Sequence, residues 1–236
     1  MARGRKRDAV MRRDTRDEAF RVLRSNLLVA IDDLDNPVVV VTSAVPGEGK
    51  TSTSVMLARS LALAGPRVVL VDLDLRRPDA HRLLYADNTP GVAEVLQNRA
   101  EIEDCLQFLP PPKGAPASRG LYFVPAGRAT ANPAEVLGTP RTGRLLEALA
   151  KEADIVLLDS PPVLPVADTL VIGRLAAGAV LVVESRRTPV QVVNRAKSAL
   201  TRNQTRILGV VLNQVRYSDD GAGYGFGYGN AAPGRE

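Results

Sequence analysis

The feature that most restricts how this chain can fold is a glycine-rich segment, residues 44–51, between a short β-branched run and a helical pattern. The segment reads Ala-Val-Pro-Gly-Glu-Gly-Lys-Thr, and the run before it extends from Val38 to Thr42. A strand, a glycine-rich turn and a helix in this order are typical of a phosphate-binding loop. The glycines let the backbone curl so that consecutive amides face an anion, and the helix N-terminus adds a favourable dipole. The strict pattern begins with glycine, and Ala44 is compatible with it where φ is negative.

Two residues at the end of this loop carry specific expectations. Lys50 is placed to reach the β- and γ-phosphates of a nucleotide, and the Thr51 hydroxyl is placed to ligate Mg²⁺. The alternative is a glycine turn with an incidental lysine. The nucleotide-binding residues that we predict are Pro46, Gly47, Glu48, Gly49, Lys50, Thr51 and Ser52.

Carboxylates close two other apolar runs. Asp72 and Asp74 end the run that begins at Val68, and Asp159 ends the run over 155–158. The carboxyl ends of parallel strands meet at one edge of a sheet, and ligands bind at that edge. Asp72 and Asp74 can serve Mg²⁺ and a proton acceptor, or they can simply cap and solvate the end of the strand. Asp159 stands where phosphate-loop enzymes place the aspartate of the Mg²⁺ shell.

Strand-like apolar runs alternate with helical patterns along most of the chain. This order is typical of an α/β fold with a mostly parallel sheet and helices on both faces. We predict a single P-loop NTPase-like domain over residues 15–216, which opens on a capping box from Thr15 to Glu18. Strands are predicted at 38–42, 68–73, 121–124, 155–158, 180–183 and 207–212, and helices at 15–32, 50–64, 140–152 and 189–201.

Composition limits the class of protein further. Of the 236 residues, 45% are hydrophobic and 24% are charged, as in a globular protein with a substantial core. The one cysteine, Cys105, excludes a disulfide framework and a cysteine-ligated metal cluster within one chain. Every apolar run is far shorter than the ~18 residues that span a bilayer. We therefore expect a soluble, intracellular protein.

The net charge of +5 is confined to the N-terminal end of the chain. Residues 1–24 hold nine Lys and Arg against four Asp and Glu, and the remaining residues are balanced. A globally basic surface for nucleic acid is not supported, so we predict no nucleic-acid partner. Residues 1–14 are expected to form a basic, flexible arm, which faces an anionic surface or is merely a solvated terminus.

The same segments carry a family resemblance. The motifs at 46–51, at 71–78 and at 158–162 resemble the three nucleotide motifs of the bacterial tyrosine kinases, the BY-kinases of capsular and exopolysaccharide synthesis. Residues 18–27 resemble the E-x-x-R-x-x-R helix through which that family's subunits associate. The resemblance covers about residues 15–216, and it implies a homo-oligomer formed through Glu18, Arg21 and Arg24.

The resemblance also implies an ATP-dependent protein-tyrosine kinase that uses Mg²⁺ and regulates polysaccharide synthesis and export. Lys50, Asp72 and Asp74 would be catalytic, with Asp72 as the proton acceptor and with Thr51, Asp74 and Asp159 as the residues that hold the metal. The roles of Asp72 and Asp74 can also be exchanged. Two further sets of residues have expected contacts with the nucleotide, Arg76 or Arg77 with its phosphates and Asn213 with its base.

A glycine-rich tail follows the last predicted strand. Residues 217–236 hold six of the 19 glycines, and this composition predicts disorder. The resemblance implies autophosphorylation of its tyrosines, Tyr217, Tyr224 and Tyr228, in trans. The alternative is a low-complexity tail with no acceptor role. Tyr85 and Tyr122 lie in regions that we predict to be ordered, and we expect structural roles for them.

The main alternative function is a non-kinase P-loop ATPase of the Min/Par partitioning group. Those proteins place a signature lysine five residues before the loop lysine, where this chain has Val45. A metal-cluster carrier of the same fold would need paired cysteines. For the kinase, the resemblance implies a membrane-spanning activator of the polysaccharide co-polymerase type and a phosphotyrosine phosphatase. The expected location is the cytoplasmic face of the membrane, reached through that activator or through a fused segment outside this sequence.

Overall fold

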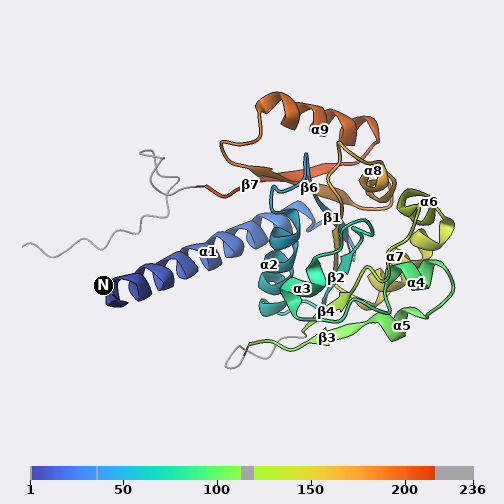
Figure 1. Cartoon of the computed structure of the whole chain (residues 1–236), viewed down its shortest axis with the longest axis horizontal. Helices are drawn as coiled ribbons and strands as arrows, with labels where there is room; N and C mark the ends of the chain where they lie inside the picture. Colours follow the sequence, from blue (N-terminus) through green and yellow to red (C-terminus); the bar gives the residue numbers. More distant parts are fainter. Residues whose placement is uncertain (1, 36, 113–119, 216–236) are drawn as a thin grey trace, which may run out of the picture.

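A twisted seven-stranded sheet forms the centre of the molecule, with the strand order β3-β4-β2-β5-β1-β6-β7 (Figure 1). The computed structural model describes residues 2–35, 37–112 and 120–215, with the backbone alone for residues 2–14. Neighbouring strands are parallel except for the pair β3–β4, which is antiparallel. The strands are β1 (Val38–Ser43), β2 (Val68–Asp72), β3 (Gln107–Leu109), β4 (Leu121–Val124), β5 (Ile155–Asp159), β6 (Gly178–Glu184) and β7 (Ile207–Asn213).

The central strands form where they do because their apolar residues are consecutive. β1, β2 and β5 are almost entirely buried, as expected for parallel strands that are covered on both faces. Alternate residues along each strand therefore enter two different hydrophobic cores. Val39, Leu70 and Leu157 enter one core, whereas Val40, Val71 and Leu158 enter the other.

Helices cover both faces of the sheet. One core is closed by α1 (Ala2–Ala30), α2 (Lys50–Leu63) and α3 (Ala80–Leu84). The other is closed mainly by α7 (Pro140–Glu152), α8 (Asp168–Gly173) and α9 (Val190–Arg202). The remaining short helices are α4 (Val92–Leu96), α5 (Ile102–Cys105) and α6 (Pro133–Leu137). The predicted α/β fold, a mostly parallel sheet with helices on both faces, is confirmed.

The first helix differs from its prediction. It begins at Ala2 rather than near Thr15, and it extends away from the body of the molecule toward the N-terminus (Figure 1). Residues 2–14 contain no proline and a single glycine, Gly4, so no strong helix breaker separates them from the amphipathic part. The capping box that we predicted at Thr15 therefore lies inside the helix. In the described residues, no helix combines the length and the apolar character needed to cross a membrane.

All six predicted strands are present, and their ends agree to within two residues. The sequence did not reveal β3, which has only three residues and pairs antiparallel with β4 at the edge of the sheet. It also did not reveal five helices, α3, α4, α5, α6 and α8, which have only four to six residues each. Segments this short cover less than two helical turns, so they show no clear periodicity.

Candidate functional site

The segment after β1 has the backbone conformation of a phosphate-binding loop. Gly47 and Gly49 adopt positive φ values of 91° and 86°, which favour glycine. Ala44 has a negative φ, so the missing first glycine costs no backbone strain. Gly49 is the N-cap of α2, and no side chain caps this helix terminus. The loop and the first turn of α2, where Ser52 is exposed, thus offer amides and a positive dipole end to an anion.

Three segments that are far apart in sequence meet beside this loop. β2, β5 and β1 are consecutive neighbours in the sheet, and Asp72 is paired in register with Asp159. The ammonium Nζ of Lys50 lies 2.8 Å from Oδ2 of Asp74 and 3.8 Å from Oδ2 of Asp159. The structure therefore brings together Lys50 and the carboxylates that we predicted from the sequence.

The charge of Lys50 is balanced within this group. Its ammonium also donates to the Thr51 hydroxyl, at 3.1 Å. Burial alone would lower the pKa of Lys50, but the attraction of Asp159 and then of Asp74 outweighs it and raises the pKa. Lys50 is therefore fully protonated at neutral pH, as a residue that binds phosphate must be.

Asp72 is held by the backbone of its own segment. Its two carboxylate oxygens accept hydrogen bonds from the amides of Asp74, at 3.0 Å, and Ala80, at 3.3 Å. The residue is fully buried. Burial first, and then repulsion from Asp159, raises the pKa of Asp72 well above that of a free aspartate. Its carboxylate thus has a higher proton affinity than an exposed aspartate.

Asp159 has one oxygen that is not satisfied by a hydrogen bond. Its Oδ1 accepts from the Ser54 hydroxyl, at 2.9 Å, whereas the buried Oδ2 has no hydrogen-bond partner. Burial raises the pKa of Asp159, although the positive charge of Lys50 opposes the shift. A buried carboxylate oxygen without a donor, next to the Thr51 hydroxyl and to Asp74, fits a Mg²⁺ ion.

The ion would depend on the nucleotide for most of its ligands. Within the described ranges, no group of three or more acidic, histidine or cysteine side chains is arranged to hold a metal ion by itself. Magnesium binds to nucleotide sites through one or two protein oxygens together with phosphate oxygens and water. Thr51, Asp74 and Asp159 are sufficient for that arrangement.

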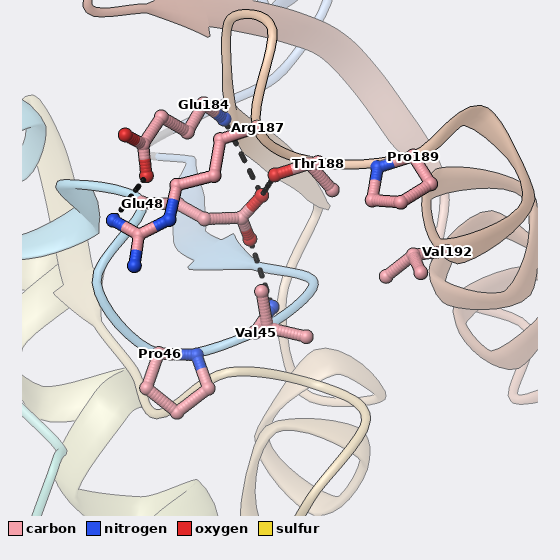
Figure 2. Close-up of a pocket in the computed structure, with 8 residues that line it drawn as sticks. All are labelled: Val45, Pro46, Glu48, Glu184, Arg187, Thr188, Pro189 and Val192. Carbon is pink, nitrogen blue, oxygen red and sulfur yellow. Dashed lines mark hydrogen bonds and ion pairs between the residues drawn. The ribbon is translucent and has the colours of Figure 1, made fainter.

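Glu48 has a different position from the one expected for a nucleotide contact. Its buried carboxylate turns away from the cradle of amides and accepts from the amides of Val45, at 2.8 Å, and Glu184, at 3.3 Å. It also accepts from the Thr188 hydroxyl. Figure 2 shows the contacts with Glu184 and Thr188, which join the loop to the end of β6 and to the segment after it. The side chain of Glu48 thus fixes the shape of the loop.

A pocket of about 220 Å³ lies between the loop and the start of α9 (Figure 2). Glu48 and the two residues of the 3.3 Å ion pair, Arg187 and Glu184, are among the residues that line it. The pocket is lined by Val45, Pro46, Glu48, Glu184, Arg187, Thr188, Pro189 and Val192.

Asn213, at the end of β7, is bound to the same loop. Its side-chain amide donates to the carbonyl oxygen of Glu48, at 2.9 Å. It also lies against Gly49, where a Cβ atom would collide with the amide nitrogen. Asn213 therefore contacts the loop at Glu48 and Gly49, a contact that the sequence did not reveal.

The two arginines of the second motif have separate roles. Arg76 makes a twofold contact with Asp168, at 2.7 Å and 3.0 Å, so its guanidinium is directed to the start of α8. Arg77 has an exposed side chain, and its amide donates to Oδ1 of Asp74, at 3.0 Å. Nothing in the sequence indicated Ser54 or Thr188, and the only signal for Asp168 was a single acidic residue in a largely apolar stretch.

The predicted association residues on α1 do not act as one group in this structure. Glu18 and Arg21 form an exposed ion pair of 2.7 Å. Arg24 instead donates to the carbonyl oxygen of Ser60 on α2, at 2.9 Å, and so fixes α1 to its own domain.

The tyrosines are also divided. Tyr122 packs against Phe108 and beneath Arg67, which confirms its structural role. The structural role expected for Tyr85 is wrong, because its side chain is 95% exposed at the end of α3 and has no core to pack into. The three predicted acceptors, Tyr217, Tyr224 and Tyr228, lie outside the described residues.

Comparison with known sequences gives one family and a set of relatives. Residues 36–224 match a family model described as ParA, NUBPL iron-transfer P-loop NTPase. The chain is 34% identical over 201 residues to the tyrosine-protein kinase YwqD of Bacillus subtilis. The aligned region covers 85% of this chain and 82% of YwqD. It is 32% identical over 202 residues to the tyrosine-protein kinase etk of Escherichia coli, which covers 86% of this chain but 27% of etk. The chain thus spans about a quarter of the longer relatives.

Solved structures agree with these relatives. The kinase domain of the Escherichia coli tyrosine kinase ETK superposes with a TM-score of 0.77 at 30% identity, over 90% of this chain and 80% of that domain. The BceF tyrosine kinase domain has a TM-score of 0.74 at 36% identity, over 83% of this chain and 76% of that chain. The MinC:MinD complex of Aquifex aeolicus has a TM-score of 0.63 at 21% identity, over 78% of this chain and 71% of that chain, and shows the shared fold alone.

Proposed function

The chain belongs to the bacterial tyrosine-kinase family, and from this premise we propose that it transfers the γ-phosphoryl group of ATP to tyrosine hydroxyls. The observation that carries the proposal is the meeting of Lys50, Asp74 and Asp159 beside a glycine-rich loop with two positive φ angles. The loop amides and Lys50 bind the phosphates, and they neutralise the charge that develops on the phosphoryl group. The residues that would hold Mg²⁺ are Thr51, Asp74 and Asp159. When bound, Mg²⁺ neutralises phosphate charge.

The transfer step needs a proton acceptor more than it needs a free phenolate. A tyrosine hydroxyl has a pKa of about 10, so at neutral pH it is protonated and attacks as its proton is removed. The phenol oxygen bonds to the γ-phosphorus, the bond from that phosphorus to the β–γ bridging oxygen breaks, and ADP leaves with the electron pair. Asp72 receives the phenolic proton, and its raised pKa supports that role. Asp74 is the candidate if the two roles are exchanged.

The acceptors that we propose are the tail tyrosines of a neighbouring copy, Tyr217, Tyr224 and Tyr228. Their segment follows β7, whose last residue, Asn213, touches the phosphate-binding loop. Each phosphate adds a charge of roughly −1.5 to −2, which is enough to weaken the contact between a tail and an anionic site. The proposed organisation has three parts: a basic arm over residues 1–14, the kinase domain over residues 15–216 and the tail over residues 217–236.

The proposed setting is polysaccharide synthesis and export at the inner face of the membrane. We propose a homo-oligomer in which Glu18 and Arg21 face a neighbouring subunit while Arg24 keeps α1 in place. The remaining proposed partners are a membrane-spanning activator of the co-polymerase type, present in cis or in trans, and a phosphotyrosine phosphatase. The net charge of +5 over residues 1–24 supports a position beside an anionic leaflet.

The test is incubation of the purified chain with Mg²⁺ and ATP, followed by detection of phosphotyrosine. The intact chain is compared with Lys50→Met, with a chain truncated after Arg216 and with Lys151→Met, a matched loss of an exposed lysine on α7. We expect label on the intact chain and on Lys151→Met only. Label that survives Lys50→Met contradicts the site, and label that survives truncation contradicts the tail as acceptor. ATP hydrolysis without phosphotyrosine favours the partitioning ATPase.

A further inference from the structure

A bidentate ion pair joins Arg76 to Asp168. Arg76 donates from Nε to Oδ2 of Asp168, at 2.7 Å, and from a terminal nitrogen to Oδ1, at 3.0 Å. The Asp168 carboxylate is completely buried, whereas 40% of the Arg76 side chain is exposed. Two parallel hydrogen bonds between a guanidinium and a carboxylate fix both distance and orientation. A buried carboxylate also needs its cation, so the pair is a fixed part of the nucleotide-free protein.

The pair lies close to the magnesium residues on the side of β2. Arg76 is two residues beyond Asp74, within one tight turn. In that turn, the amide of Arg77 donates both to the carbonyl oxygen of Asp74, at 3.2 Å, and to its side chain, at 3.0 Å. A displacement of Arg76 would therefore also displace the Asp74 carboxylate.

On the side of β5, Asp168 belongs to the segment that follows Asp159. Asp168 opens α8, and the next residue, Thr169, donates to the carbonyl oxygen of Pro161. The Ser160 hydroxyl in turn donates to the carbonyl oxygen of Val41 on β1, at 3.1 Å. Asp168 thus belongs to the hydrogen-bonded segment that directly follows Asp159 at the end of β5.

We propose that Asp168 is a positioning residue that acts through Arg76 to hold Asp74 in the place where it serves magnesium. The inference rests on the nucleotide site of the proposed function, but not on the identity of the hydroxyl that receives the phosphoryl group. Without the Asp168 charge, the Arg76 guanidinium is released and the turn from Asp74 to Arg77 loosens. The loop amides lie between β1 and α2, and Lys50 lies at the start of α2. Because these groups belong to other segments than Arg76 and Asp168, we expect them still to bind the phosphates.

The test separates magnesium-dependent binding from phosphate binding. The affinity for a fluorescent ADP analogue is measured over a Mg²⁺ titration and again in excess EDTA, for the full chain. The variants are Asp168→Asn and Arg76→Lys, the second of which keeps the charge but loses the planar fork. The matched control is Glu94→Gln, another buried carboxylate, whose oxygens accept the amides of Gly91 and Arg128 away from the three motifs.

We expect both variants to raise the Mg²⁺ concentration at half-saturation by about tenfold, the usual effect of removing an outer-shell partner. ADP affinity in EDTA stays within about twofold of the wild type, as does every value for Glu94→Gln. An equal loss of affinity with and without Mg²⁺ makes Arg76 a direct phosphate contact and overturns the proposal. A shift in Glu94→Gln as large as that in Asp168→Asn overturns it too, because the effect is then general softening.

Two further outcomes keep the test decisive. If Asp168→Asn does not fold, Arg76→Lys carries the same expectation, because its side chain is partly exposed. If the magnesium shift is found but the chain never forms phosphotyrosine, the proposed kinase function fails while the positioning role stands.

Discussion

Lys50 is bound more closely to Asp74 than to Asp159, with Nζ–Oδ2 distances of 2.8 Å and 3.8 Å. The lysine that is expected to bind a nucleotide phosphate is thus already the cation of a carboxylate on the neighbouring segment. An incoming phosphate must compete with Asp74 for this ammonium. Magnesium can compensate by taking the released carboxylate, so the nucleotide and its metal are expected to bind cooperatively.

Removing Lys50 is therefore expected to destabilise the protein as well as to abolish phosphate transfer. Lys50→Met leaves Asp74 and Asp159 without their cation, and breaking a buried pair in this way costs about 3 kcal/mol. In the double variant Lys50→Met/Asp74→Asn, the combined loss is expected to be smaller than the sum of the single losses by about 1 kcal/mol or more. Urea unfolding at pH 7 measures all three variants, and Lys151→Met serves as the control. Simple additivity would show that the pair is not coupled.

Gly49 is expected to tolerate no side chain. Alanine there must adopt a left-handed φ, at a cost of about 1 kcal/mol, and its Cβ collides with the Asn213 amide. We expect Gly49→Ala to weaken ATP binding at least about tenfold, which corresponds to about 1.4 kcal/mol. Adding Asn213→Ala removes the collision but not the strain, so it restores only part of the loss. The control is Gly143→Ala on α7, where a Cβ meets nothing within 4 Å and is expected to stabilise the helix.

The contact between Glu48 and Thr188 is expected to influence the affinity for the nucleotide, although neither side chain is expected to contact the nucleotide. Thr188→Val keeps the shape of the side chain but removes one of the donors to a buried carboxylate, a loss of about 1–3 kcal/mol. The loop is then less well ordered, and we expect ATP to bind several times more weakly. Calorimetric titration of Thr188→Val against Thr201→Val, an exposed site on α9, measures the difference. Equal affinities would mean that the loop holds its shape without this contact.

The sequence was most informative where the physical signal is local. The phosphate-binding loop depends on glycines within five residues of one another, and both Gly47 and Gly49 have the left-handed conformation that this pattern requires. The buried strands β1, β2 and β5 are runs of consecutive apolar residues, so their places in the chain were predictable. Because parallel strands end at the same edge, the meeting of the carboxylates at Asp72 and Asp159 followed from the fold class.

The rest depends on the paths of loops, which no local pattern fixes. Thr188 reaches Glu48 across 140 residues of sequence, and Arg76 reaches Asp168 across 92. Neither partner could be identified until the ends of β6 and β5 had been placed beside the loop. The start of α1 differs from its prediction for another reason. Helix propensity in residues 2–14 is ordinary, and the capping pattern at Thr15 does not by itself begin a helix.

Cys105 is expected to be chemically silent in the folded protein. Its side chain is buried, and burial raises the pKa of the thiol to about 11, with further repulsion from Glu94. Thiolate is the reactive form, and at pH 8 almost none is present in the folded state. A thiol reagent at pH 8 should therefore label the native chain far more slowly than the urea-unfolded chain. Labelling at the same rate in both states would contradict the buried position of Cys105.

Because β2, β5 and β1 are neighbours in the sheet, their backbone hydrogen bonds set the spacing of the residues at their ends. Strands joined by hydrogen bonds keep a spacing of about 4.8 Å, and they cannot slide without breaking every rung. The roots of the phosphate-binding loop, of Asp72 and of Asp159 are therefore fixed relative to one another. Any conformational change between the nucleotide-free and nucleotide-bound protein therefore has to occur outside these strands, in the turn after β2, in the segment after β6 or in α8.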